Sequence, residues 1–155
     1  MRLVVIGNSG SGKSTFARRA AAEHDLVYLE LDTIVWEGHG APVERPREVA
    51  RAQLAAFVAQ HERWVIEGCD GDLAEAALPA CTELVFMNPG VDACVANNRR
   101  RPWEPHKYDS AADQARMLPA LLAWVESYYM RDDVRSYAYH RRVFDAFGGA
   151  KRELS

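Results

Sequence analysis

The feature that most constrains the fold of this chain is a glycine-rich octapeptide that follows a short apolar run. Residues 7–14 read Gly-Asn-Ser-Gly-Ser-Gly-Lys-Ser and match the pattern G-x-x-x-x-G-K-[ST] at every specified position. The preceding run Leu3–Ile6 predicts a buried strand, and the following segment Lys13–Glu23, which lacks Pro and Gly, predicts a helix. Because strand, loop and helix stand in the order that the motif requires, we expect an α/β fold with a mainly parallel sheet.

The residue types of the octapeptide suit the binding of phosphate groups. Glycines let the backbone turn tightly and point consecutive N–H groups at an anion, and the following helix N-terminus adds ~0.3–1 kcal/mol per favourable charge. The lysine supplies a mobile cation for the β- and γ-phosphates, and the last serine is placed to ligate Mg²⁺. The alternative, a flexible glycine-serine turn, leaves the flanking strand and helix unexplained. We therefore predict that a nucleoside triphosphate is bound by Gly7, Asn8, Ser9, Gly10, Ser11, Gly12, Lys13, Ser14 and Thr15.

The rest of the chain alternates short apolar runs with longer helical stretches. The runs predict strands at Leu26–Leu31, Arg63–Gly68 and Glu83–Met87. The helical stretches are Arg47–Gln60, Leu73–Leu78, Val91–Arg101, Leu118–Met130 and Val134–Phe147, and glycines and prolines indicate a loop over Trp36–Pro46. Strands that alternate with helices need crossover connections. The sequence therefore predicts one domain over residues 1–155, a three-layer P-loop NTPase fold with a mainly parallel sheet of four or five strands.

Composition excludes several classes of function. The net charge of −3 argues against bulk electrostatic binding of nucleic acid, although Arg99–Lys107 is a local basic stretch. Three cysteines without metal-ligand spacing are typical of a reducing compartment. No apolar run approaches the ~20 residues that span a bilayer, and no signal segment precedes the first strand. We expect a cytoplasmic protein without a membrane partner.

Two large classes of phosphate-loop protein do not fit. The guanine-reading motif N-K-x-D of small GTPases is absent, which favours ATP as the nucleotide. Motor and ring-forming ATPases need a longer chain and an acidic pair after the third strand, where this chain has the single carboxylate Glu67. What remains is a small kinase, or a binding module that kept only the loop.

Several motifs in order then point to a family. They are residues 7–15, Leu31-Asp32 with Trp36, residues 64–68, and Asn88-Pro89 leading to Cys94 and Arg99-Arg100. In these the sequence resembles the adenylate-kinase-like group of small P-loop kinases, and within it the topology-modulation or adenylate-kinase-related proteins. The resemblance covers roughly residues 1–101; it implies an ATP-dependent phosphotransferase with a short arginine-bearing lid at about 99–113. Many members have Asp where this chain has Glu67 and Asn88.

The resemblance implies roles for five further residues. Asp32 follows the second predicted strand, where such kinases place an aspartate near the acceptor hydroxyl or in the shell of the Mg²⁺ ion. Glu67 ends the third strand and, with Ser14, is a candidate magnesium ligand. The lid arginines are candidates to stabilise the transferring phosphoryl group, and sequence does not choose among Arg99, Arg100 and Arg101. Structural alternatives are a helix cap for Asp32, an ordinary edge carboxylate for Glu67, and helix C-terminal charges for the arginines.

The acceptor half of the predicted site is less defined. Four aromatic and histidine side chains after the second strand and in the lid suit contact with an acceptor or adenine, and core packing or a brace for the lid explains them equally well; they are Trp36, Trp103, His106 and Tyr108. Arg131-Asp132-Asp133 is a weak match to a segment between lid and core in adenylate kinases. The stripe Leu118, Leu121, Leu122, Val125 and Tyr128 is typical of a core, and Tyr129, Tyr137 and Tyr139 are a candidate dimer face. His39 receives no role. The expected partners are ATP and a small-molecule or nucleotide acceptor; a nucleotide-dependent regulator is the alternative, and the oligomeric state stays open.

Overall fold

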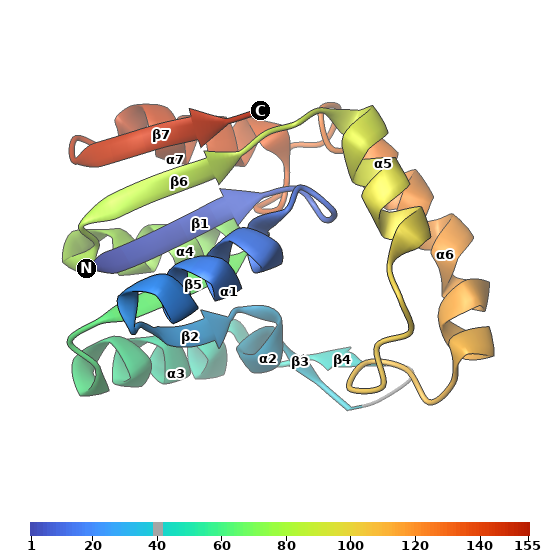
Figure 1. Cartoon of the computed structure of the whole chain (residues 1–155), viewed down its shortest axis with the longest axis horizontal. Coiled ribbons are helices and arrows are strands. Elements are labelled where there is room, and N and C mark those ends of the chain that lie inside the picture. Colours follow the sequence, from blue (N-terminus) through green and yellow to red (C-terminus); the bar gives the residue numbers. More distant parts are fainter. Residues whose placement is uncertain (39–41) are drawn as a thin grey trace.

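A five-stranded parallel sheet forms the centre of the molecule in the computed structural model, which describes residues 1–38 and 42–155. The strand order is β2-β5-β1-β6-β7, and every neighbouring pair is parallel (Figure 1). The strands are β1 (Arg2–Gly7), β2 (Val27–Glu30), β5 (Trp64–Gly68), β6 (Glu83–Met87) and β7 (Ala150–Leu154). The predicted α/β class with a mainly parallel sheet is confirmed.

Helices cover both faces of the sheet and give three layers. On one face, Val4 and Ile6 of β1 pack with residues of α2 (Asp32–Val35), α3 (Arg47–Gln60), α4 (Gly71–Ala77) and α7 (Tyr137–Ala146). On the other face, Leu3 and Val5 pack against α1 (Lys13–His24). Because side chains alternate along a strand, β1 is buried on both sides and its C-terminal end delivers the glycine loop to the edge of the sheet.

A second group of elements stands beyond this edge of the sheet. Helix α5 (Val91–Arg100) packs against α6 (Ala111–Glu126), and residues 101–110 connect them. In Figure 1 this connection runs from the lower ends of both helices toward the hairpin of β3 (Trp36–Glu37) and β4 (Val43–Glu44). The connection and the hairpin therefore bound the space in front of the glycine loop.

Two segments differ from their sequence predictions at the level of strands. The predicted loop over Trp36–Pro46 contains the β3–β4 hairpin, and His39 lies outside the described residues. The two-residue strands are too short to show an alternating pattern. Strand β7 follows Gly148-Gly149, where no strand was predicted, because its exposed Ala-Lys-Arg-Glu run lacks the apolar residues of a buried strand. The parallel pairing with β6 provides the backbone hydrogen bonds that stabilise this segment as a strand.

Two helices begin at serine caps that the sequence prediction did not use. Helix α6 begins at Ala111 instead of Leu118, because the Ser110 hydroxyl accepts a hydrogen bond from the backbone N–H of Asp113. Helix α7 begins at Tyr137 instead of Val134, and Ser136 caps it in the same way. A short 3₁₀ turn, Leu78–Ala80, follows α4. None of the helices among residues 1–38 and 42–155 is both long and apolar enough to cross a membrane.

Candidate functional site

The glycine loop joins β1 to α1 and adopts the backbone that its glycines permit. Gly10 and Gly12 have φ values of 78° and 94°, a region that L side chains rarely adopt. A Cβ on Gly10 would lie 2.4 Å from the carbonyl oxygen of Cys94 on α5, so this position also needs glycine for space. Gly12 precedes α1 and gives its first turn no side-chain cap. The N-terminal N–H groups of α1 are therefore open to an anion.

The lysine of the motif lies folded over the loop. Lys13 is only 6% exposed, and its Nζ donates a 2.7 Å hydrogen bond to the carbonyl oxygen of Asn8. The Asn8 side chain in turn donates to the carbonyl oxygen of Val125 on α6, which fixes the loop against that helix. The Ser11 hydroxyl is buried and has no hydrogen-bond partner among the described residues.

A hydrogen-bonded carboxylate lies beneath the first turn of α1. Glu67 is the penultimate residue of β5, is 2% exposed, and accepts hydrogen bonds on Oε1 from the Ser14 hydroxyl at 2.9 Å and from the Tyr28 hydroxyl at 2.6 Å. Burial, reinforced by the Glu67 charge, raises the pKa of Tyr28 far above its usual value, so the phenol remains a donor. The structure thus brings together Ser14 and Glu67, the two predicted magnesium ligands.

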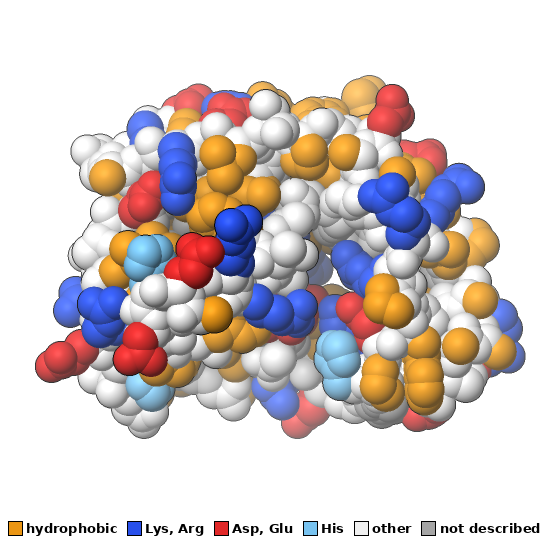
Figure 2. Space-filling view, viewed as in Figure 1, with side chains coloured by type: hydrophobic (Ala, Val, Ile, Leu, Met, Phe, Trp, Pro, Cys, Tyr) orange, Lys and Arg blue, Asp and Glu red, His pale blue; other side chains and the backbone are white. Residues whose placement is uncertain are grey.

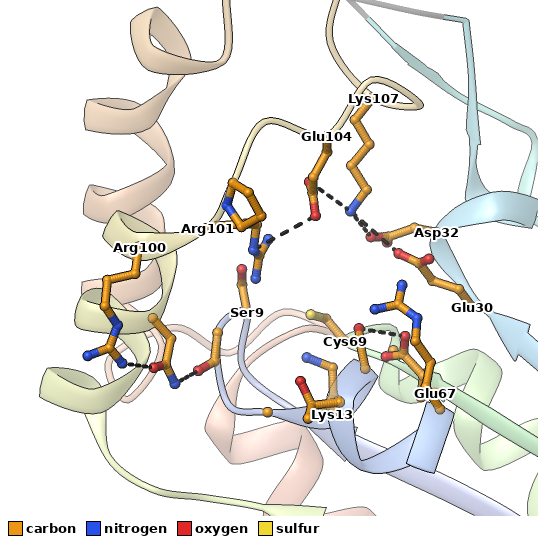
Figure 3. A pocket seen from close by; sticks show the side chains of 18 residues that line it. Ser9, Lys13, Glu30, Asp32, Glu67, Cys69, Arg100, Arg101, Glu104 and Lys107 are labelled. Carbon is orange, nitrogen blue, oxygen red and sulfur yellow. Dashed lines mark hydrogen bonds and ion pairs between the residues drawn. The ribbon is translucent and has the colours of Figure 1, made fainter. Parts of the chain in front are cut away.

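Lys13, Ser14 and Glu67 line a cleft with a volume of about 450 Å³. The surface is hollowed between the body of the molecule and the α5–α6 side, with charged side chains at the rim (Figure 2). Figure 3 shows Lys13 and Glu67 on one side of the cleft and residues of the 101–110 connection on the other. Of the predicted phosphate-binding residues, the cleft is lined by Ser9, Gly10, Gly12, Lys13, Ser14 and Thr15. Gly7, Asn8 and Ser11 shape the loop from behind.

The connection between α5 and α6 closes over the carboxylates at the end of β2. Lys107 lies 3.4 Å from Glu30, 3.5 Å from Asp32 and 3.7 Å from Glu104, measured from Nζ to the nearest carboxylate oxygen. The carboxylates outweigh burial and raise the pKa of Lys107. Asp32, the predicted acceptor-orienting residue, begins α2 and therefore stands at the mouth of the cleft.

The three candidate arginines separate in space. Arg101 lines the cleft and pairs with Glu104 at 3.9 Å. Arg100 also lines it, but its guanidinium donates to the Asn97 side chain at 2.6 Å and points away from Lys13 (Figure 3). Arg99 is exposed and lines neither this cleft nor the cavity beside it. Of the three, Arg101 is the one that lines both this cleft and the cavity beside it.

A second cavity of about 500 Å³ adjoins the first. Trp36, Tyr108, Leu121 and Trp124 line it with several charged residues. The predicted core stripe is divided here, since Val125 and Tyr128 are buried while Leu121 faces the cavity. The two cavities share the lining residues Ser9, Glu30, Asp32, Cys69, Arg101, Glu104 and Lys107.

Sequence reasoning missed several lining residues. Glu30 pairs in register with Glu67. It stands between Leu29 and Leu31, which pack in the core, and this polar position within an apolar run was the sequence signal that could have identified it. Cys69 lines both cavities; burial raises its pKa to about 11, so it is a neutral thiol at neutral pH. The role of Lys107 depends on the path of the connection, which residue types do not encode.

The oxygen-rich lining fits a magnesium-bound triphosphate. Mg²⁺ is bound in such proteins through one or two side-chain oxygens, waters and phosphate oxygens, so the Ser14 hydroxyl and the Glu67 carboxylate supply the right donors. No cluster of three or more His, Cys, Asp or Glu side chains that holds a metal alone occurs within residues 1–38 and 42–155. A site completed by phosphate oxygens does not require one.

The parallel sheet, the glycine loop and the helix that follows it define this chain as a P-loop α/β protein. The profile of the family described as AAA domain matches residues 3–123, and the chain belongs to that family. It is similar to the unliganded structure of a sugar kinase from Janibacter sp. HTCC2649, with 15% identity, a TM-score of 0.53, and coverage of 99% of this chain and 83% of that one. It is also similar to shikimate kinase from Aquifex aeolicus vf5, with 20% identity, a TM-score of 0.49, and coverage of 82% and 81%. At such identities the likeness shows the fold, and none of the curated proteins matches this chain.

Proposed function

We propose that this chain is an ATP-dependent phosphotransferase that moves the γ-phosphoryl group of ATP to a small-molecule acceptor. The observation that carries this proposal is the pair of adjoining cavities, one over the glycine loop and one beside it, which meet at Asp32. A module that only binds a nucleotide has no need of the second cavity. The similarity in fold to a sugar kinase supports the same reading.

The first cavity is the donor site in this proposal. The backbone of the loop and the N-terminus of α1 hold the phosphates, and Lys13 leaves its contact with the Asn8 carbonyl to meet the β- and γ-phosphates. Ser14 and Glu67 would hold Mg²⁺, which when bound would neutralise charge on the phosphates. Arg101 adds a planar cation from the lid side of the cleft.

The second cavity holds the acceptor with a hydroxyl at the junction. Asp32 orients this hydroxyl and takes its proton as the oxygen bonds to the γ-phosphorus and the bond to the bridging β–γ oxygen breaks, which releases ADP. Lys107 holds the lid against Asp32 and Glu30, and the closed lid keeps water away from the γ-phosphoryl group.

The proposal extends to the organisation of the chain. Residues 1–155 act as one domain, with a lid at about 99–113 that includes Lys107 as well as the arginines. The motifs at residues 7–15, 31–36, 64–68 and 88–100 support a place for the chain among the adenylate-kinase-like, topology-modulation group of small kinases. ATP is the favoured nucleotide because the guanine-reading motif is absent.

The test is a screen for acceptor-dependent release of ADP from ATP and Mg²⁺. The right acceptor should raise the rate at least tenfold over ATP alone, and Lys13→Ala should abolish the increment because Lys13 is the lysine that meets the β- and γ-phosphates in this proposal. Lys151→Ala is the matched control: Lys151 lies on β7 and contacts carbonyl oxygens of residues 144 and 145. If nucleosides, sugars, cyclitols, acids and nucleotides all leave the rate unchanged while ATP binds, the phosphotransferase function is wrong and a nucleotide-dependent regulator replaces it.

A further inference from the structure

The charges around the second cavity restrict what it binds. Its lid side carries Lys107 and Arg101, and both are already paired. Lys107 lies within 3.7 Å of three carboxylates, those of Glu30, Asp32 and Glu104, and Arg101 pairs with Glu104. Lys107 is therefore not free to neutralise an anionic acceptor without losing the contacts that hold the lid, and the proposed function assigns Arg101 to the phosphates of ATP.

The third cation of the lining is paired as well. Arg135 precedes α7, and its guanidinium lies 2.8 Å from Asp70 and 3.2 Å from Glu44. Asp70 also receives Arg47 at 2.8 Å on the same oxygen, Oδ1. The described lining thus holds four carboxylates (Glu30, Asp32, Asp70 and Glu104) against three paired cations (Arg101, Lys107 and Arg135).

The wall carries more carboxylates than lysine and arginine side chains. An ionised carboxylate only accepts hydrogen bonds, so a ligand that suits this wall brings donors. An anionic ligand brings acceptors and a charge of the wrong sign, beside a cleft that already holds a triphosphate.

Apolar side chains form the other part of the lining. Trp36 and Trp124 face the cavity with Leu121 and Met117. Each indole is held by a guanidinium over its ring, Arg135 at 5.3 Å from the centroid of Trp36 and Arg131 at 4.5 Å from that of Trp124. Such a combination of fixed aromatic walls and a few convergent polar groups suits a compact ring with an apolar face and polar edges.

From these observations we propose that the acceptor is an uncharged, ring-shaped polyhydroxy compound, and not a nucleotide or another anion. The inference rests on the proposed phosphotransferase function and specifies its acceptor. The hydroxyls at the ring edge donate to the carboxylates of the wall, one of them reaches Asp32, and the ring lies against the tryptophans. Lys107 and Arg135 then keep their carboxylate partners.

The test is a titration of tryptophan fluorescence in the full chain, without nucleotide, using matched neutral and anionic pairs. The probes are glucose against glucuronate, myo-inositol against its monophosphate, and adenosine against its 5′-monophosphate. The neutral member of at least one pair should give a saturable signal, and its anionic partner should bind at least tenfold more weakly. Trp124→Phe should remove most of the signal, whereas Trp103→Phe should keep it, because Trp103 lies in the lid and lines neither cavity.

A charge variant makes the test independent of the choice of probe. Glu104→Gln releases Arg101 and Lys107 from one shared carboxylate without unfolding the chain. The ratio of the dissociation constants of the anionic and the neutral probe should therefore fall at least threefold. An anionic partner that binds as tightly as its neutral counterpart, or a signal carried by Trp103, overturns the inference. ADP release with an anionic acceptor leaves the phosphotransferase function standing and overturns only the acceptor class; absence of acceptor-dependent ADP release in every class overturns both.

Discussion

At the scale of single residues, the Glu67 carboxylate depends on the groups that donate to it. Tyr28→Phe removes one of the two hydroxyl groups that donate to Glu67 and leaves the Glu67 side chain buried. A buried charged acceptor that loses a partner costs about 1–3 kcal/mol, so we expect the free energy of unfolding in urea to fall by that amount. The measurement is a pair of urea titrations, wild type against variant.

Tyr139→Phe is the matched control for this prediction. It removes the tyrosine hydroxyl that donates to Glu75, whose side chain is 41% exposed. The free energy of unfolding is therefore expected to fall by no more than about 0.5 kcal/mol. Equal losses in the two variants contradict the view that Glu67 is held by buried hydrogen bonds.

At the scale of elements, the lid is held over the cleft by Lys107. Lys107→Ala removes its contacts with Glu30, Asp32 and Glu104, each worth about 0.2–1 kcal/mol in partly exposed pairs. We expect backbone amides of residues 103–110 to exchange roughly threefold faster or more, as measured by hydrogen–deuterium exchange and mass spectrometry. Arg116→Ala is the control, since Arg116 pairs with Asp113 within α6. Equal exchange rates in the two variants contradict the view that Lys107 holds the connection over the cleft.

Elements were predictable where a local pattern specified them. The glycine loop, the strands at its side and the helix after it follow from residue types alone, since β1 and β5 are apolar and α1 lacks breakers. Strand β7 was not, because its charged run becomes a strand only by pairing with β6. In the site, Lys13, Ser14 and Glu67 were predicted as a group; Lys107 and Glu30 were not, because their meeting depends on how the connection folds back.

At the scale of the whole molecule, a buried histidine ties the stability of the fold to pH. His140 of α7 is 0% exposed and contacts the Tyr128 hydroxyl at 2.7 Å and the carbonyl oxygen of Cys69 at 2.6 Å, which links α7 to the end of β5. Burial lowers its pKa from 6.5 to about 4. Because the folded chain binds this proton more weakly than the unfolded chain, acidification from about pH 6.5 to pH 4 favours unfolding.

Between pH 7 and pH 4.5, protonation of His140 should lower the free energy of unfolding by roughly 2–3 kcal/mol. The His140→Asn variant lacks this group, so its free energy of unfolding should fall by about 2–3 kcal/mol less than that of the wild type over the same range. Urea titrations at the two pH values measure it, with His24→Asn as the control because the His24 side chain is exposed. If wild type and His140→Asn lose the same stability on acidification, His140 titrates normally in the folded chain.

The central claim, transfer of the γ-phosphoryl group to an acceptor, is tested most directly by following phosphorus. A ³¹P NMR spectrum recorded during turnover of ATP with the acceptor found in the screen should show one new phosphoester for each ADP, with little inorganic phosphate, since the closed lid excludes water. Inorganic phosphate equal to ADP, with no phosphoester, would contradict the account and make the chain a nucleotide hydrolase.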